Sequence, residues 1–197
     1  YLNSFKHKKN WYYLSHHNYK IDKFLLAANA LNKKNIYVFR MGAKVEEKFG
    51  ENNPMIIDYA NLSIRSELMD IYLASKCLFA IGTGTGAIGV AEIYRKPILD
   101  LNANLHHMLT YLKNCIMLSK HYYSKRLKRN LKLKEIMKYE IHELQTRIQL
   151  DEEEIEMVDC TEEEIMNASI ELLEKIEKNW LIEEKDKSLQ DKFKNNY

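Results

Sequence analysis

Apolar residues in the first part of the chain alternate between helix-spaced positions and short continuous runs. Residues 22–33 repeat apolar side chains at helical spacing and predict a helix. The runs 36–41 and 55–59 are rich in β-branched and aromatic residues and predict strands. Residues 66–75 return to helical spacing, with Ser66 in place to cap the new helix. Strands and helices therefore follow one another from the start of the pattern.

The middle of the chain repeats this order around a glycine-rich break. Residues 77–81 form an apolar run without alternation, which is typical of a strand buried on both faces of a parallel sheet. The chain then breaks at 82–86 (GTGTG), and residues 87–95 predict a short helix. A further buried strand is predicted over 97–101.

Beyond this point we predict strands over 115–118 and 155–158, with a helix over 133–147 between them. A last helix begins at Thr161, the first residue of a capping-box match, and its apolar stripe runs to Trp180. The pattern predicts an α/β, Rossmann-like layered fold with a mainly parallel sheet.

This fold is expected to occupy residues 1–180 as one domain, in which 1–20 are a lead-in segment. Residues 181–197 are mostly polar and are expected to form a tail that frays.

Composition places the chain among globular proteins. Of the 197 residues, 46% are hydrophobic and 29% charged, and the net charge of +2 is too small to indicate a nucleic-acid binder. The longest stretch without a charged residue, 77–91, is shorter than the ~20 residues of a membrane span. Three distant cysteines and no signal peptide favour a reducing, cytoplasmic setting. Because the chain begins with Tyr1, we expect it to be the later part of a longer protein.

The glycine-rich break carries the clearest chemistry. Between a predicted strand and a predicted helix, glycines let backbone N–H groups approach an anion, and the helix adds the positive end of its dipole. Thr83 and Thr85 add hydroxyl donors. The break therefore predicts a site for a phosphate or diphosphate. The alternative is that the glycines only make a tight turn.

A dinucleotide site is a second interpretation of the same segment. Gly84-x-Gly86-x-x-Gly89 matches the dinucleotide fingerprint, and Asp100 is expected to end the next strand, as a ribose-binding acid would. However, Asp100 follows the first glycine by sixteen residues rather than ~20, and at least two predicted strands precede the match. An NAD(P)-dependent oxidoreductase is thus the runner-up.

Several segments in order resemble a known family. The turn 82–86 followed by 95–102 (RKPILDLN) resembles the nucleotide-binding half of GT-B-fold glycosyltransferases. The chain as a whole is similar to a family of bacterial glycosyltransferases from surface-polysaccharide gene clusters. The similar segments are 1–3, 17–19, 37–42, 57–60, 65–73 and the turn, with weaker similarity at 118–120, 133–136 and 155–165.

The resemblance implies transfer of a sugar from a nucleotide-diphosphate donor to a glycan or lipid-linked acceptor. In a GT-B enzyme the C-terminal half holds the donor, so this chain would be the donor half. The family's His-x-Arg element and its acceptor half would precede Tyr1. The isolated chain could then bind donor without catalysing transfer.

Roles can be assigned to residues on this basis. The departing diphosphate gains negative charge and needs fixed donors. We expect donor binding by Arg40, Gly42, Asp58, Tyr59, Thr83, Gly84, Thr85, Gly86, Glu92, Asn102 and Lys120. Arg40 could form a bidentate phosphate contact, and Tyr59 could stack on the base. Each has a structural alternative, such as a surface arginine for Arg40 or a hydrogen-bonded strand end for Asp58. The catalytic residue is not identified; His17 and Arg40 are the candidates.

We expect neither a metal ion nor a cofactor. No Asp-x-Asp motif occurs, and the adjacent pairs His16-His17 and His106-His107 lack the i, i+4 spacing of a zinc pair. The nucleotide sugar is a substrate.

Two charge runs complete the pattern. Residues 120–134 hold seven basic residues and no acid, whereas nine of the fourteen residues 151–164 are acidic. The two runs could be solvated, mutually compensating faces. Alternatively, 120–134 could make a peripheral contact with anionic lipid at the inner face of the membrane. No nucleic-acid-binding motif accompanies the basic run. A third interpretation of the chain is a non-catalytic domain that docks a partner through its charged runs.

Overall fold

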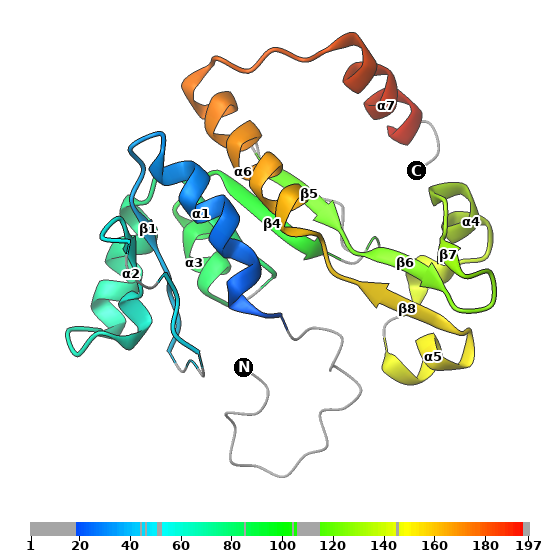
Figure 1. The fold of residues 1–197 in the computed structure, drawn as a ribbon, viewed down its shortest axis with the longest axis horizontal. Helices are drawn as coiled ribbons and strands as arrows, with labels where there is room; N and C mark the ends of the chain where they lie inside the picture. The colour runs from blue at the N-terminus through cyan, green and yellow to red at the C-terminus, as the bar shows by residue number, and fades with distance from the viewer. Residues whose placement is uncertain are drawn as a thin grey trace.

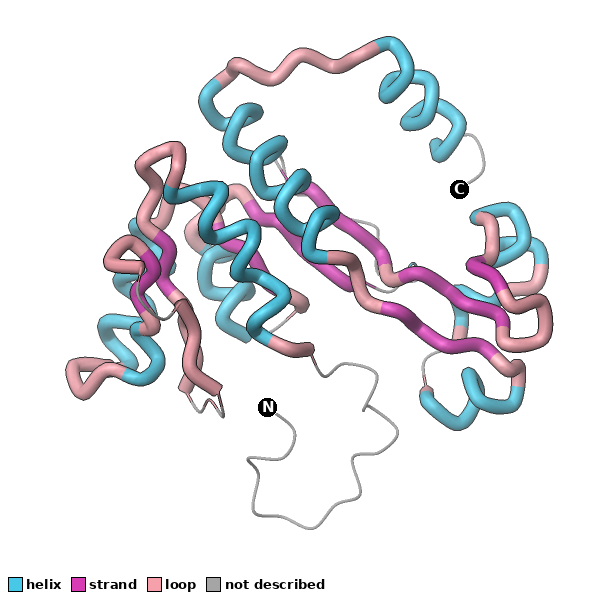
Figure 2. The backbone as a smooth tube through the Cα atoms, viewed as in Figure 1, coloured by secondary structure: helices cyan, strands magenta, loops and turns pink. Residues whose placement is uncertain are grey.

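The protein is a mixed α/β chain, and its described residues form three small sheets (Figures 1 and 2). The structure is a computed structural model that describes residues 19–43, 45, 47–50, 53–84, 86–103, 105, 115–144 and 146–194. The helices are α1 (Leu25–Asn32), α2 (Glu67–Lys76), α3 (Gly86–Ile93), α4 (Leu133–Lys138), α5 (Arg147–Glu152), α6 (Glu162–Glu177) and α7 (Glu184–Lys194). The strands are β1 (Val38–Phe39), β2 (Ile56–Ile57), β3 (Ala80–Gly82), β4 (Ile98–Ala103), β5 (Cys115–Ser119), β6 (His121–Ser124), β7 (Arg129–Asn130) and β8 (Ile155–Val158).

A three-stranded parallel sheet, ordered β3-β4-β5, forms the centre of the molecule. Helices α1 and α6 lie side by side and pack on it (Figure 1). The sheet contributes Leu99 and Leu101 of β4 to this core, and α6 contributes Ile165, Ala168 and Leu172. The stripe predicted for the last helix is thus the face that packs on the sheet as far as Ile176. Helix α6 ends at Glu177, so Trp180 lies beyond it, contrary to the prediction.

Helix α1 also connects the central sheet to a two-stranded parallel sheet. Strand β1 pairs with β2 in the register Val38↔Ile56 and Phe39↔Ile57. Ala28 of α1 packs with Phe49 and Ile56 in a core of its own. Both parallel sheets therefore bring the carboxyl ends of their strands into loops that carry predicted site residues.

The third sheet, β7-β6-β8, is antiparallel, so the parallel prediction is wrong for this part of the chain. Strands β6 and β7 were not predicted, because the hairpin is short and its charged residues obscure the strand pattern. The predicted helix 133–147 is also wrong as one element. The chain breaks after α4 because Glu140 adopts a left-handed conformation (φ 54°), and α5 starts at Arg147.

The C-terminal tail forms a helix instead of fraying. Helix α7 follows an extended connection from α6 (Figure 1) and buries none of its residues. None of the helices that the structure describes has the length and apolar character that a membrane crossing requires.

The N-terminus of α6 is fixed as the sequence predicts. Thr161 caps the helix by accepting from the Glu164 N–H, and the Glu164 carboxylate accepts from the Thr161 N–H at 2.8 Å. His121 of β6 lies 3.0 Å from the same carboxylate. Partial burial raises the pKa of Glu164, but the Thr161 N–H and the His121 contact outweigh it, so the pKa lies below its usual range.

We expect Glu164→Gln to lower the free energy of unfolding by about 0.5 kcal/mol at neutral pH, because glutamine keeps the cap but loses the charge. A carboxylate with a depressed pKa stabilises the fold above its unfolded-state pKa, and this contribution is lost as pH falls through the folded-state pKa. Urea unfolding of both proteins across this range should show the difference vanishing in acid. A difference that grows in acid would contradict this account.

Candidate functional site

The glycine turn joins β3 to α3 at the carboxyl end of the central sheet. Gly82 ends β3, and Gly86 is the first residue of α3. Gly84 has φ +65°, a conformation that side chains other than glycine rarely adopt. Gly84 and Gly86 are exposed. Among the described residues, no side chain or carbonyl accepts a hydrogen bond from the N–H of either glycine.

The four glycines of this region differ in what a side chain would meet. A Cβ on Gly82 would lie 2.4 Å from the Ile88 side chain, so this glycine is needed for packing. In the part of the chain that the structure describes, a Cβ on Gly84, Gly86 or Gly89 would meet nothing within 4 Å. The described residues therefore leave the space in front of Gly84 and Gly86 open. In the dinucleotide fingerprint the third glycine serves close packing of helix against strand. Gly89 makes no such approach.

Arg40 and Asp58 follow β1 and β2 and pair with one another. The Arg40 guanidinium lies 2.9 Å from the Asp58 carboxylate, and the two side chains are 9% and 16% exposed. Asp58 also accepts from the Phe49 N–H and from Asn61, while Arg40 donates to the Glu47 carbonyl. We call this set the Arg40–Asp58 clamp. It fastens the 47–49 loop to the strand ends, so both predicted ligands already have protein partners.

Burial raises the pKa of Asp58, but hydrogen bonds from Asn61, Arg40 and Phe49 and the charge of Arg40 outweigh burial. The pKa therefore lies below its usual range, and Asp58 is held as a carboxylate.

Tyr59 and Gly42 have local structural functions. Tyr59 is buried, and its hydroxyl accepts from the Ser66 N–H at 3.0 Å, next to the Ser66 cap of α2. Gly42 has φ +156°, and a Cβ there would lie 2.7 Å from the Val45 side chain. The prediction that Tyr59 stacks on a base is not supported by this buried position.

Glu92 and Asn102 lie in different environments. Glu92 is exposed on α3, two turns from the glycines. Asn102 is buried in β4 with φ 56°, and its side-chain oxygen accepts from the Cys160 N–H at 2.7 Å. Strand β4 continues to Ala103, so Asp100 lies inside the strand rather than at its end, contrary to the prediction.

Lys120 connects β5 to β6 and is almost fully buried. Its ammonium lies 2.7 Å from the Asp159 carboxylate and 4.5 Å from the centre of the Tyr19 ring. Lys23 reaches the other oxygen of Asp159 at 3.7 Å. Burial lowers the pKa of Lys120, and the hydrogen bond and charge of Asp159 oppose this effect. Lys120 therefore belongs to a buried cluster and is not part of an exposed basic face.

Two site predictions lie outside the described residues, His17 and Thr85. The structure brings Thr83, Gly84 and Gly86 together in the turn and brings Arg40 to Asp58. Among the described residues, no hydrogen bond joins the clamp to the turn. Sequence reasoning did not identify Tyr19 or Asp159. The position of Asp159 in the sequence is a signal that could have identified it, because it is an acidic residue between a predicted strand and a capping box.

The remaining basic run lies on the β6–β7 hairpin and the start of α4, where residues 125–130 are exposed. Arg129 pairs with Glu135 at 2.6 Å. Because β6 pairs antiparallel with β8, Glu154 in the acidic run lies beside Lys125, whose N–H donates to the Glu154 carbonyl. The two charge runs are therefore neighbours, as compensating faces would be. Membrane contact through 120–134 stays a prediction.

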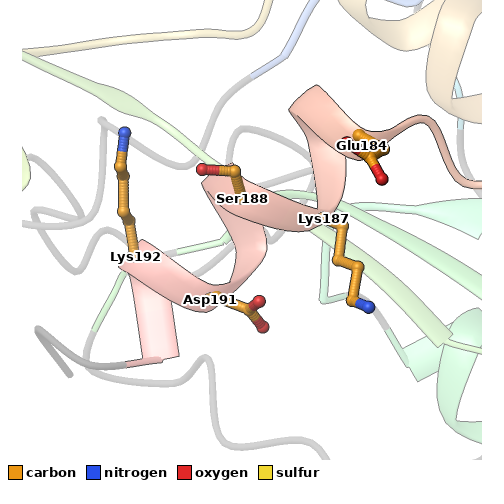
Figure 3. A pocket seen from close by; sticks show the side chains of 5 residues that line it. All are labelled: Glu184, Lys187, Ser188, Asp191 and Lys192. Carbon is orange, nitrogen blue, oxygen red and sulfur yellow. The ribbon is translucent and has the colours of Figure 1, made fainter.

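A shallow depression lies on α7 (Figure 3). Its side chains all come from this one exposed helix: Glu184, Lys187, Ser188, Asp191 and Lys192. We do not assign a function to it. The described residues contain no group of three or more His, Cys, Asp or Glu side chains that could hold a metal ion.

Comparisons of the chain with models of protein families, with curated protein sequences and with solved structures find no match.

Proposed function

We propose that this chain is the donor-binding half of a GT-B-type glycosyltransferase and holds a nucleotide-diphosphate sugar on the glycine turn. The sugar would pass to a glycan or lipid-linked acceptor of a bacterial surface polysaccharide. The order of the resembling segments supports the family, and the parallel α/β architecture is compatible with it. The acceptor half and a catalytic residue would be supplied from outside the described residues.

One observation carries the proposal: Gly84 and Gly86 are exposed at the start of α3, and no described residue lies within 4 Å of where their side chains would stand. Their backbone N–H groups and the α3 dipole would stabilise the charge that develops on the departing diphosphate. The Thr83 hydroxyl lies in the same turn. The Arg40–Asp58 clamp would keep the 47–49 loop in place without contacting the donor.

Isothermal titration calorimetry of the whole chain with UDP, GDP, CDP and dTDP tests this function. We expect binding of one nucleoside diphosphate, weaker binding of the matching monophosphate, and no requirement for a divalent cation. A folded sample that gives no heat with any of the four would contradict the proposal. Fluorescence enhancement of NADH that is lost in Asp100→Ala would favour the oxidoreductase instead.

A further inference from the structure

Two turns of opposite charge lie side by side at one end of the antiparallel sheet (Figure 1). The first, residues 125–128, joins β6 to β7 and carries two lysines and an arginine; we call it the basic turn. The second, residues 152–154, leads from α5 into β8 and consists of three glutamates; we call it the acidic turn. The two turns are in contact, because the Lys125 N–H donates to the Glu154 carbonyl at 2.9 Å.

The charges of these turns are not matched within the chain. Their six charged side chains are exposed and have no ion-pair partner among the described residues: Lys125, Arg126, Lys128, Glu152, Glu153 and Glu154. The pairs beside the turns are already formed, since Arg129 contacts Glu135 at 2.6 Å and Arg147 contacts Asp151 at 3.0 Å. Like charges therefore crowd together within each turn, and opposite charges from outside would stabilise both turns.

Local hydrogen bonds fix the basic turn. The Ser124 hydroxyl accepts from the Leu127 N–H at 3.2 Å. The Arg129 guanidinium donates to both oxygens of the Glu135 carboxylate, which fastens β7 to the start of α4. Leu127 is 46% exposed in the middle of the turn, so an apolar side chain stands between the cations. A surface that is already ordered loses little conformational entropy on binding, which favours its use as a contact.

The arrangement of the charges selects the kind of partner. A uniformly anionic surface, such as lipid headgroups or nucleic acid, would meet the acidic turn together with the basic one. Because the turns are in contact, they lie within the screening length of about 8 Å at physiological salt, and repulsion from the glutamates would offset attraction to the cations. A partner that carries both signs side by side fits better. A second copy of this chain does so, since a two-fold rotation places the basic turn of each copy against the acidic turn of the other.

We propose that the basic and acidic turns form a self-complementary surface through which two copies of this chain associate as a two-fold dimer. Both turns find opposite charges at once in this arrangement, so the assembly closes instead of growing into a filament. The surface belongs to the antiparallel sheet and the glycine turn to the central sheet, so the inference does not depend on the proposed function. A contact made by two short turns is small, and the dimer is therefore expected to be weak and sensitive to salt.

A charge swap tests this surface. Arg126→Glu/Lys128→Glu gives both turns a net negative charge, and Glu152→Lys/Glu153→Lys gives both a net positive charge. Either variant alone would place like charges opposite one another, whereas a mixture of the two restores opposite charges across the contact. Sedimentation equilibrium of the whole chain and its variants, in about 0.05 M and about 0.5 M NaCl, measures the association.

Lys185→Glu/Lys187→Glu is the matched control. It changes the net charge of the chain by as much as Arg126→Glu/Lys128→Glu does, but on the exposed helix α7, which carries neither turn. We expect this control to dimerise within about twofold of the wild type, because the contact depends on local charge. An equal loss in the control and in Arg126→Glu/Lys128→Glu would assign the effect to net charge and overturn the proposed surface.

We expect the wild type to dimerise in low salt and to associate at least about tenfold more weakly in high salt. Each swap variant alone should associate at least about tenfold more weakly than the wild type, and their mixture should come within about threefold of it. A wild type that is monomeric in low salt overturns the inference, as does a mixture that fails to associate. Co-sedimentation of a monomeric wild type with phosphatidylserine vesicles would assign the basic turn to lipid instead. Should a double variant not fold, Arg126→Glu and Glu153→Lys make the same comparison with a smaller change in charge.

Discussion

Gly86→Val should weaken nucleoside-diphosphate binding at least tenfold in a protein that stays folded. Among the described residues, a Cβ at Gly86 meets no atom within 4 Å, so valine costs little in packing there, and it replaces a residue with poor helix propensity. The same Cβ and its methyl groups would occupy the space in front of the N–H groups that are proposed to hold the diphosphate. Calorimetry measures the affinity, and thermal unfolding measures the stability.

Gly89→Val provides the matched control. Gly89 lies in the same helix, three residues further on, and a Cβ there would also meet no described residue within 4 Å. We expect this variant to bind with wild-type affinity, so equal losses in both variants would contradict a site at the turn. Gly84→Val is a less clean test, because φ +65° adds about 1 kcal/mol of backbone strain for any side chain.

Local signals predicted the elements that border the turn. Ser66 and Thr161 cap α2 and α6 as expected, because a cap depends on residues that are adjacent in the sequence. Strand β4 is largely buried in the parallel sheet, as predicted for 97–101. The unbroken apolar run 77–81, in contrast, is not buried on both faces: β3 begins only at Ala80 and is half-buried, and Leu78 is exposed. The position of the glycine turn after β3 was also predictable, because the strand, the glycines and the helix are contiguous in the sequence.

Contacts between distant segments were not predictable in this way. The Lys120–Asp159 pair joins residues 39 positions apart, and nothing near Lys120 distinguishes it from the exposed lysines that follow it. Arg40 and Asp58 each follow a strand, but only the parallel β1–β2 pairing shows that they meet. The β6–β7 hairpin was missed because its strands are short and its turn is basic rather than rich in glycine.

Asp58→Ala should lower the free energy of unfolding by about 3 kcal/mol, because it leaves a mostly buried Arg40 charge without its partner. The variant also removes the acceptor for the Phe49 N–H and for Asn61. Asp151→Ala is the control: it breaks an exposed i, i+4 pair with Arg147 and should cost about 0.3–0.5 kcal/mol.

The effect of Asp58→Ala should depend on pH. Because the folded-state pKa of Asp58 is depressed, its stabilisation is complete above the unfolded-state pKa and is lost as pH falls through the folded-state pKa. Urea unfolding should therefore show the gap between wild type and variant closing below about pH 4. A loss of less than 1 kcal/mol at neutral pH together with lost nucleotide affinity would indicate that Asp58 contacts the donor and is not part of a clamp.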